Sequence, residues 1–279
     1  MSNIVIIGTS VLDQIMNLRK EFSDYGCNKV DITVSHGGSM RNVAENCALL
    51  KIPVDFISKF GNDAPALDII SHLNKQQVIV HGPTVDQPTP IFIKVNGNRE
   101  LMFATTTPAF SFNRQDSFPT ALLKNAEYGI TDNSDPDFLH FLYEHSDNLK
   151  WILSAFIPHY SMLKQTEGII LNQRELADYL QDNNLSDYLL YLNDCGLKWL
   201  IITEGNKGCT LVRHREIKHY PAIEKEGNSL GCGDAFLSGI IYGLLKSWDW
   251  DRILDFAQEA ALITLDTNTS VNQKISSLI

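Results

Sequence analysis

The chain has 279 residues, of which 44% are hydrophobic and 20% are charged, and its formal net charge is −10. This length allows one large α/β domain or two small domains. The acidic balance and the lack of a Lys/Arg-rich run argue against a nucleic-acid or anionic membrane surface as the main partner.

The ends and the cysteines indicate an ordinary cytoplasmic protein. The N-terminus has no basic region followed by a long apolar stretch, and no window of 18 apolar residues occurs. The five cysteines are scattered and have no CxxC spacing: Cys27, Cys47, Cys195, Cys209 and Cys232. We therefore expect free thiols, with neither a zinc site nor a disulfide framework.

The first third of the chain contains several strand signals. The apolar run Ile4–Ile7 ends at Gly8, which is typical of a buried strand. Residues 28–36 alternate loosely, which predicts a strand with one wet face. Asn96 and Gly97 separate two β-rich runs within 89–105, and this pair predicts a hairpin.

From about residue 120, helix-like segments alternate with short apolar runs at 128–130, 151–153, 169–171 and 199–202. This alternation predicts βαβ units on a mainly parallel sheet. We expect the first third to supply antiparallel strands and the rest to build a layered α/β body. The chain is then a single domain over 1–279, with a small β-sheet lid from roughly 14–36 and 86–108.

A glycine-rich segment precedes an almost wholly apolar stretch, 235–245, that predicts a buried helix. Gly231, Cys232 and Gly233 would open this helix, whose free N–H groups and positive dipole end form an anion site. Asp234 is a carboxylate at the same end. It either serves only as an N-terminal helix charge, or acts as a general base on a hydroxyl that lies between it and a phosphate.

Five segments in order resemble the ribokinase (PfkB) family of sugar and nucleoside kinases. Gly231-Cys-Gly-Asp-Ala-Phe-x-x-Gly239 is similar to its C-terminal signature, and the stretch from Gly37-Gly38 to Asn42-Val-Ala44 is similar to its N-terminal one. The other three are Gly8 to Asp13, Asn172 to Glu175, and Thr203-Glu204-Gly205 with Gly208. Each segment is unspecific alone, whereas the five in order are specific.

The resemblance implies a ribokinase-like three-layer α/β/α domain that uses ATP and Mg²⁺. Backbone amides of Gly231, Cys232 and Gly233 would hold the transferring phosphoryl group, and Asp234 would take the hydroxyl proton. The implied nucleotide-side residues are Asn172, Glu175, Thr203, Gly205, Asn228, Phe256, Ala260 and Asn272, with Glu175 meeting Mg²⁺ through water. The implied substrate-side residues are Asp13, Gly37, Gly38, Arg41 and Asn42.

Simpler interpretations stand beside several of these roles. Asn172 and Glu175 are also suited to a helix cap and a surface charge. Arg41 is either a solvated helix residue or a contact to a polar base. Cys232 either has a lowered pKa at its helix terminus or is a small residue where the family usually has Ala.

The segment Arg41-Asn-Val-Ala-Glu-Asn46 is closest to the pseudouridine kinase branch of the family. We therefore hypothesise ATP-dependent phosphorylation of the 5′-hydroxyl of pseudouridine or a close nucleoside. The alternatives are a ribokinase-like kinase for ribose or another sugar or nucleoside, and a catalytically weak nucleoside-binding member. Asn228 stands where most members carry Asp, which argues against activation by a monovalent cation.

The strand at Ile4–Ile7 opens like a dinucleotide-binding fold, but the single Gly8 after it lacks the GxGxxG pattern, so an oxidoreductase is not expected.

The open edges of a β lid provide a candidate surface for a homodimer.

Overall fold

The computed structural model describes residues 3–98, 100–105, 108–182, 196–213 and 216–279. Cys195 and residues 99 and 106–107 of the predicted lid lie outside the described residues. The other four cysteines are free thiols, as expected.

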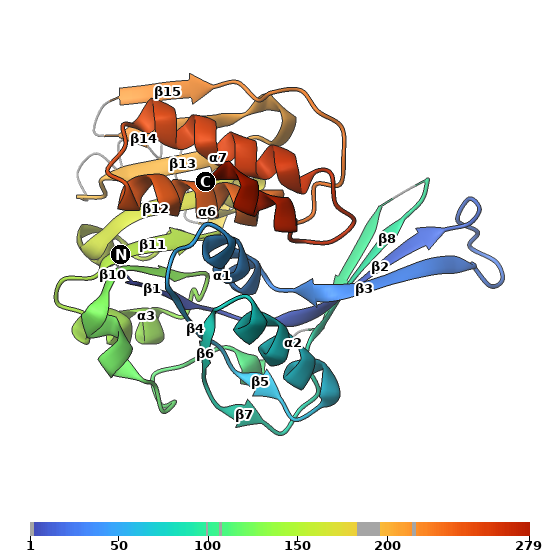
Figure 1. Cartoon of the computed structure of the whole chain (residues 1–279), viewed down its shortest axis with the longest axis horizontal. Helices are drawn as coiled ribbons and strands as arrows, with labels where there is room; N and C mark the ends of the chain where they lie inside the picture. Colours follow the sequence, from blue (N-terminus) through green and yellow to red (C-terminus); the bar gives the residue numbers. More distant parts are fainter. Residues whose placement is uncertain (1–2, 99, 106–107, 183–195, 214–215) are drawn as a thin grey trace.

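A large mixed sheet forms the centre of the molecule (Figure 1). Among the described residues nine strands build it, in the order β15-β14-β13-β12-β11-β10-β1-β4-β6. Their bounds are β1 Asn3–Ile7, β4 Val54–Ile57, β6 Ile79–His81, β10 Ala126–Thr131, β11 Lys150–Ser154, β12 Thr166–Asn172, β13 Trp199–Thr203, β14 Cys209–Arg213 and β15 Glu216–Tyr220. All neighbours pair in parallel except β13-β14 and β14-β15, which are antiparallel.

Strand β1 shows why the domain has three layers. Its side chains alternate, so Ile4 and Ile6 pack into one apolar core while Val5 and Ile7 pack into a second core on the opposite face. The first core is closed by helices α1 Ser39–Leu49, α2 Ala64–Lys75, α6 Cys232–Leu245 and α7 Trp250–Thr264, and the second by α3 Pro136–Glu144 and α4 Gln173–Asp182.

The four apolar runs predicted after residue 120 lie in β10, β11, β12 and β13. The predicted helices between them are less regular. Helix α3 connects β10 to β11, but only the 3₁₀ helix η3, Tyr160–Gln165, lies between β11 and β12. The antiparallel strands β14 and β15 extend the sheet beyond the predicted parallel part.

A smaller sheet projects from the main body (Figure 1). Its four described strands have the order β3-β2-β8-β9, with bounds β2 Val11–Leu18, β3 Val30–Gly37, β8 Ile91–Asn96 and β9 Leu101–Ala104. It occupies the region expected for the lid, and β8 and β9 form the hairpin around Asn96-Gly97. Strands β2 and β8 pair in parallel, because the chain returns to the main body between them.

The expectation that the first third supplies antiparallel strands and the rest the α/β body is wrong in one respect. Strands β1, β4 and β6 also come from this part of the chain and lie at the centre and one edge of the main sheet. Strand β4 at residues 54–57 is short and wholly buried, so it shows no alternation of buried and exposed positions that would indicate a strand.

The remaining short elements are β5 Phe60–Gly61, β7 Thr84–Val85, η1 Pro108–Phe110, η2 Thr120–Asn125, η4 Gly205–Lys207 and η5 Gln273–Leu278. Within the described ranges, every helix is too short or too polar to cross a membrane.

Candidate active site

The predicted anion site lies at the first turn of α6. Gly231 is the N-cap residue with φ of 80°, and a Cβ there would lie 1.9 Å from the carbonyl oxygen of Ser270. Only glycine fits both the left-handed backbone and this close approach. The N–H of Cys232 donates to Ser229 O at 3.2 Å, so it closes the turn. The following N–H groups of the first turn are those that an α-helix leaves unpaired toward its N-terminal end.

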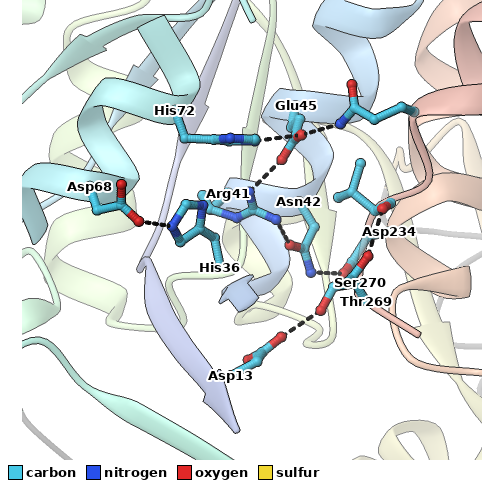
Figure 2. Close-up of polar contacts among 12 residues, drawn as sticks. Asp13, His36, Arg41, Asn42, Glu45, Asp68, His72, Asp234, Thr269 and Ser270 are labelled. Carbon is cyan, nitrogen blue, oxygen red and sulfur yellow. Dashed lines mark hydrogen bonds and ion pairs between the residues drawn. The ribbon is translucent and has the colours of Figure 1, made fainter. Parts of the chain in front are cut away.

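Asp234 faces α1 across the site (Figure 2). Its Oδ1 accepts a hydrogen bond from Ser39 Oγ, and its Oδ2 accepts one from Asn42 Nδ2 at 2.7 Å. Burial raises the pKa of Asp234 to about 6, although these two hydrogen bonds and the charge on Arg41 act to lower it. The carboxylate is therefore ionised at neutral pH, and its basicity is higher than that of an ordinary aspartate.

Asp13 is the second carboxylate of the site and comes from lid strand β2. It is 3% exposed, and its Oδ2 accepts from Ser270 Oγ. A Cβ at Gly37 would lie 1.9 Å from Asp13 Oδ1, so a glycine is needed for the carboxylate to enter the site. Burial raises the pKa of Asp13, while the Ser270 hydrogen bond and the Arg41 charge oppose this. Gly38 caps α1 in the same corner.

Arg41 and Asn42 both belong to α1, but only Asn42 contacts Asp234. Arg41 is 1% exposed, so it is not a solvated helix residue. Its two terminal nitrogens donate to Glu45 and Asn42. In this arrangement the nearest polar partners of the Arg41 guanidinium are the side chains of Glu45 and Asn42. The guanidinium does not bind in the space beside Asp234.

A cavity of about 520 Å³ opens on the other side of the α6 N-terminus. Thr203 and Gly205, two of the residues expected on the nucleotide side, line it together with Cys232 and Gly233 of the α6 turn. The α7 side is lined by Gln258, Ala261, Leu262 and Leu265. Its volume is in the range of small-molecule sites.

Six residues expected on the nucleotide side do not line this cavity: Asn172, Glu175 and Asn228, which are described below, and Phe256, Ala260 and Asn272. Phe256 stacks on Tyr242 with ring centroids 5.0 Å apart, and Ala260 is fully buried. Both lie on the core stripe of α7, whereas the lining residues lie on the neighbouring stripe. Asn272 caps η5 and donates to Ile263 O at 2.6 Å.

Asn172 and Glu175 form a reciprocal cap on α4. Asn172 Oδ1 accepts from the N–H of Glu175 at 2.9 Å, and Glu175 Oε2 accepts from the N–H of Asn172 at 2.8 Å. In the described part of the chain no group of three or more His, Cys, Asp or Glu side chains could enclose a metal ion. Glu175 uses one of its two carboxylate oxygens in this cap. A single carboxylate suits Mg²⁺ held through water, which is how this ion commonly binds beside phosphates.

Two neighbouring residues, Glu204 and Asn228, do not line the nucleotide cavity, whereas Cys232 does. Glu204 accepts from Thr210 Oγ1 at 2.7 Å, so its charge points toward β14. Asn228 uses both ends of its amide on the backbone, donating to Thr267 O at 3.1 Å and accepting from the N–H of Leu230 at 3.2 Å. Burial and the nearby charge of Asp234 raise the pKa of Cys232 to about 11, so the lowered thiol pKa considered from the sequence is wrong.

The sequence patterns missed Asp132, which follows β10. It lies in a second cavity of about 400 Å³, lined by Gly8, Thr9, Phe110, Ser111, Phe112, Asp132, Asn133, Ser134 and Asp135. Burial, together with the charge of Asp234, raises the pKa of Asp132 to about 7. The available signal was a polar side chain directly after the apolar run 128–130, at the edge where β1 also ends.

A half-buried carboxylate at a helix N-terminus, with a nucleotide-sized cavity on one side and polar groups under a β lid on the other, is suited to phosphoryl transfer to an alcohol. The model of the pfkB family carbohydrate kinases matches residues 1–274, and the chain belongs to this family. The protein is therefore a phosphotransferase with an alcohol group as acceptor.

Known proteins agree with this fold and family. The ATP-dependent 6-phosphofructokinase of Thermoanaerobacterium thermosaccharolyticum is 22% identical over 91% of this chain and 84% of its own length. The structure of Arabidopsis thaliana ribokinase complexed with ribose and ATP matches with a TM-score of 0.79 and 16% identity, covering 99% of this chain and 98% of that one. A pseudouridine-metabolizing bifunctional protein of Schizosaccharomyces pombe is 39% identical over 66 residues, which are 23% of this chain and 9% of that protein.

Replacing Asp132 by asparagine should stabilise the protein at pH 8 by about 2 kcal/mol but not at pH 4. The folded pKa is raised to about 7 from 3.8, so the stability linked to this group is full below pH 3.8 and is lost as pH rises through about 7. Urea unfolding at both pH values measures the difference. Replacing the exposed Asp86 by asparagine is the control, and an equal gain at both pH values for Asp132→Asn would contradict the assignment.

Proposed function

We propose that the protein is an ATP-dependent kinase for the primary 5′-hydroxyl of a nucleoside, with pseudouridine as the lead substrate. The observation that carries this proposal is the position of Asp234 between the cavity of about 520 Å³ and the polar groups of Asp13 and Asn42. A carboxylate in that position can reach a hydroxyl that faces a phosphate at the α6 N-terminus.

The phosphoryl transfer needs one proton acceptor and groups that stabilise the negative charge of the phosphates. The substrate oxygen attacks the γ-phosphorus in line, its proton passes to Asp234, and the bond from the γ-phosphorus to the β–γ bridging oxygen breaks to release ADP. The N–H groups of Gly231 and Gly233 and the α6 dipole would stabilise the transferring group, whereas the N–H of Cys232 is used by Ser229 O. Mg²⁺, held through water by Asn172 and Glu175, would neutralise phosphate charge.

The sugar would lie under the lid. Asp13 can accept hydrogen bonds from two hydroxyls, and Asn42 can both donate and accept. Gly37 and Gly38 leave room for the sugar to rest against backbone. These residues suit a ribose whether or not a nucleobase is attached. They therefore support a sugar or nucleoside as the substrate, and recognition of a nucleobase would depend on other residues.

The cavity that contains Asp132 supports a nucleoside over a free sugar. Gly8, at the end of β1, also lines this cavity. The interaction between the charges of Asp132 and Asp234 indicates that the cavity lies near Asp234. A carboxylate there would accept hydrogen bonds from ring N–H groups. Pseudouridine presents one more ring N–H than uridine, because its sugar is attached to carbon.

A screen of ADP release tests the substrate assignment. Pseudouridine should be turned over at least about 10-fold faster, in kcat/KM, than uridine, inosine, adenosine, ribose or fructose. Omitting potassium should change the rate less than twofold, because Asn228 uses its amide within the protein. Faster turnover of ribose favours the ribokinase-like alternative, and tight nucleoside binding with no ADP release favours the catalytically weak one.

Replacing Asp234 by asparagine tests the base. We expect kcat to fall about 10³-fold or more, while the KM for ATP stays within about threefold. In the parent, kcat/KM should fall as pH drops below about 6, because Asp234 must be ionised and its pKa is raised to about 6. An Asp234→Asn enzyme with a kcat within tenfold of the parent would contradict this role.

We also propose that the lid pairs two copies of the chain. The strand register gives the sheet an outward face that carries Ile32, Val34 and Phe103, each 55% exposed. Met16, Ile93, Val95 and Leu101 lie on the same face. Apolar side chains next to one another on an open sheet favour association with an identical face.

Light scattering after size-exclusion chromatography tests the pairing. The parent should elute as a dimer, and Phe103→Lys should elute as a monomer because the lysine charge would be buried. Met102→Lys is a matched control, since Met102 is also 55% exposed but lies on the opposite face of the same strand. A parent that is monomeric at micromolar concentration would refute the proposal.

A further inference from the structure

Helix α1, which faces the proposed base Asp234, contains a buried ion pair between Arg41 and Glu45 (Figure 2). Arg41 Nη1 lies 2.5 Å from Glu45 Oε2, and the two residues are 1% and 2% exposed. Taking two charges out of water costs several kcal/mol for each ion, and a well-packed apolar pair is often at least as stable. A pair retained in this position invites a functional explanation.

Both oxygens of Glu45 are held by other side chains, Oε2 from within α1 and Oε1 from two other elements. Oε2 accepts from Arg41, and Oε1 lies 2.8 Å from His72 Nε2 of α2 and accepts from Gln273 Nε2 of η5 at 2.7 Å. Burial alone would raise the pKa of Glu45, but the bond to His72 and the charge on Arg41 hold it at about 2. Glu45 is therefore an anion with a fixed position, and it holds one edge of the guanidinium.

The other edge of the guanidinium contacts the residue that binds Asp234. Arg41 Nη2 donates to Asn42 Oδ1, and Asn42 Nδ2 donates to Asp234 Oδ2 at 2.7 Å. A guanidinium has only donors, so it selects the oxygen end of the neighbouring amide. The NH₂ end of Asn42 must then face Asp234.

We propose that Arg41, held by Glu45, is a positioning residue for phosphoryl transfer that fixes the Asn42 amide with its NH₂ group toward Asp234. This inference rests on the proposed role of Asp234 as base. Arg41 acts through Asn42 and does not touch the reacting atoms. It therefore differs from the direct substrate contact expected from the sequence.

The reverse orientation of the amide would harm catalysis. A flipped Asn42 would present its oxygen to the Asp234 carboxylate and remove one of the two side-chain donors that favour the ionised form. It would also present its NH₂ group to a cation. The Nε–H of Arg41 has no partner among the described side chains and backbone, so Glu45 and Asn42 are the two acceptors that orient the guanidinium.

A charge-free variant of the pair tests the inference. Arg41→Met combined with Glu45→Gln leaves no unpaired buried charge, and the new glutamine side chain keeps an acceptor for His72 and Gln273. We expect kcat with the preferred nucleoside to fall about 10- to 100-fold, with the KM for ATP within twofold and the unfolding midpoint within a few degrees of the parent. A folded double variant with kcat within twofold of the parent would overturn the inference.

A double-mutant cycle separates positioning from general damage. In an Asn42→Ala background, assayed at pH 9 and so well above the raised pKa of Asp234, the Arg41/Glu45 change should alter kcat less than twofold, because the amide that it orients is gone. An equal loss of kcat in both backgrounds would overturn the proposal, since it would indicate a structural role. Tyr143→Phe is the control, because it removes a buried hydrogen bond to Thr166 on the opposite layer and should leave kcat unchanged.

Arg41→Lys provides a second route if the double variant fails to fold. Lysine keeps the charge for Glu45 but lacks the planar fork that serves two acceptors. The same cycle should show a loss of about 5-fold or more in kcat with Asn42 present and less than twofold in the Asn42→Ala background. An active Asp234→Asn enzyme would refute the base itself, whereas an inactive Asp234→Asn with a fully active Arg41→Lys would refute only the positioning role.

Discussion

In the proposed mechanism the N-terminus of α6 has to accommodate two negative charges, a transferring phosphoryl group and the Asp234 carboxylate. Burial alone drives the carboxylate toward its neutral form, so the site depends on donors that keep it ionised. Helix α1 supplies them through Ser39 and Asn42, and the charge of Arg41 adds to their effect. Under the proposed role of Asp234, the packing of α1 against α6 would serve catalysis as well as the core, which accounts for a helix with charged residues that is buried on every side.

The strands and the phosphate turn could be predicted from local patterns. Apolar runs identified β10 to β13, and glycines before an apolar stretch identified the start of α6. The partners of the two carboxylates could not be predicted in this way. Ser39 lies 195 positions from Asp234, and Ser270 lies 257 positions from Asp13. Contacts at such separations depend on how the layers pack, and no local pattern encodes that packing.

The nucleotide side shows a subtler limit of the sequence. Phe256 and Ala260 were expected on the nucleotide side, and Gln258, which lies between them in the chain, does line the cavity. Phe256 and Ala260 instead face the core. Helical periodicity identifies an apolar stripe, but a cavity wall made of alanine and leucine is also apolar, so hydrophobicity cannot separate the two faces of α7. The same problem does not arise at Asp234, where charge marks the functional face.

The hydroxyl of Ser39 donates a hydrogen bond to Asp234 Oδ1. An incoming alcohol has to share or displace this bond, and a sugar held by Asp13 and Asn42 can offset the loss with its other hydroxyls. A water molecule meets the same competitor without those extra contacts. Under the proposed role of Asp234, the serine would favour an alcohol over water as the acceptor, and it would limit hydrolysis of ATP in the absence of an acceptor.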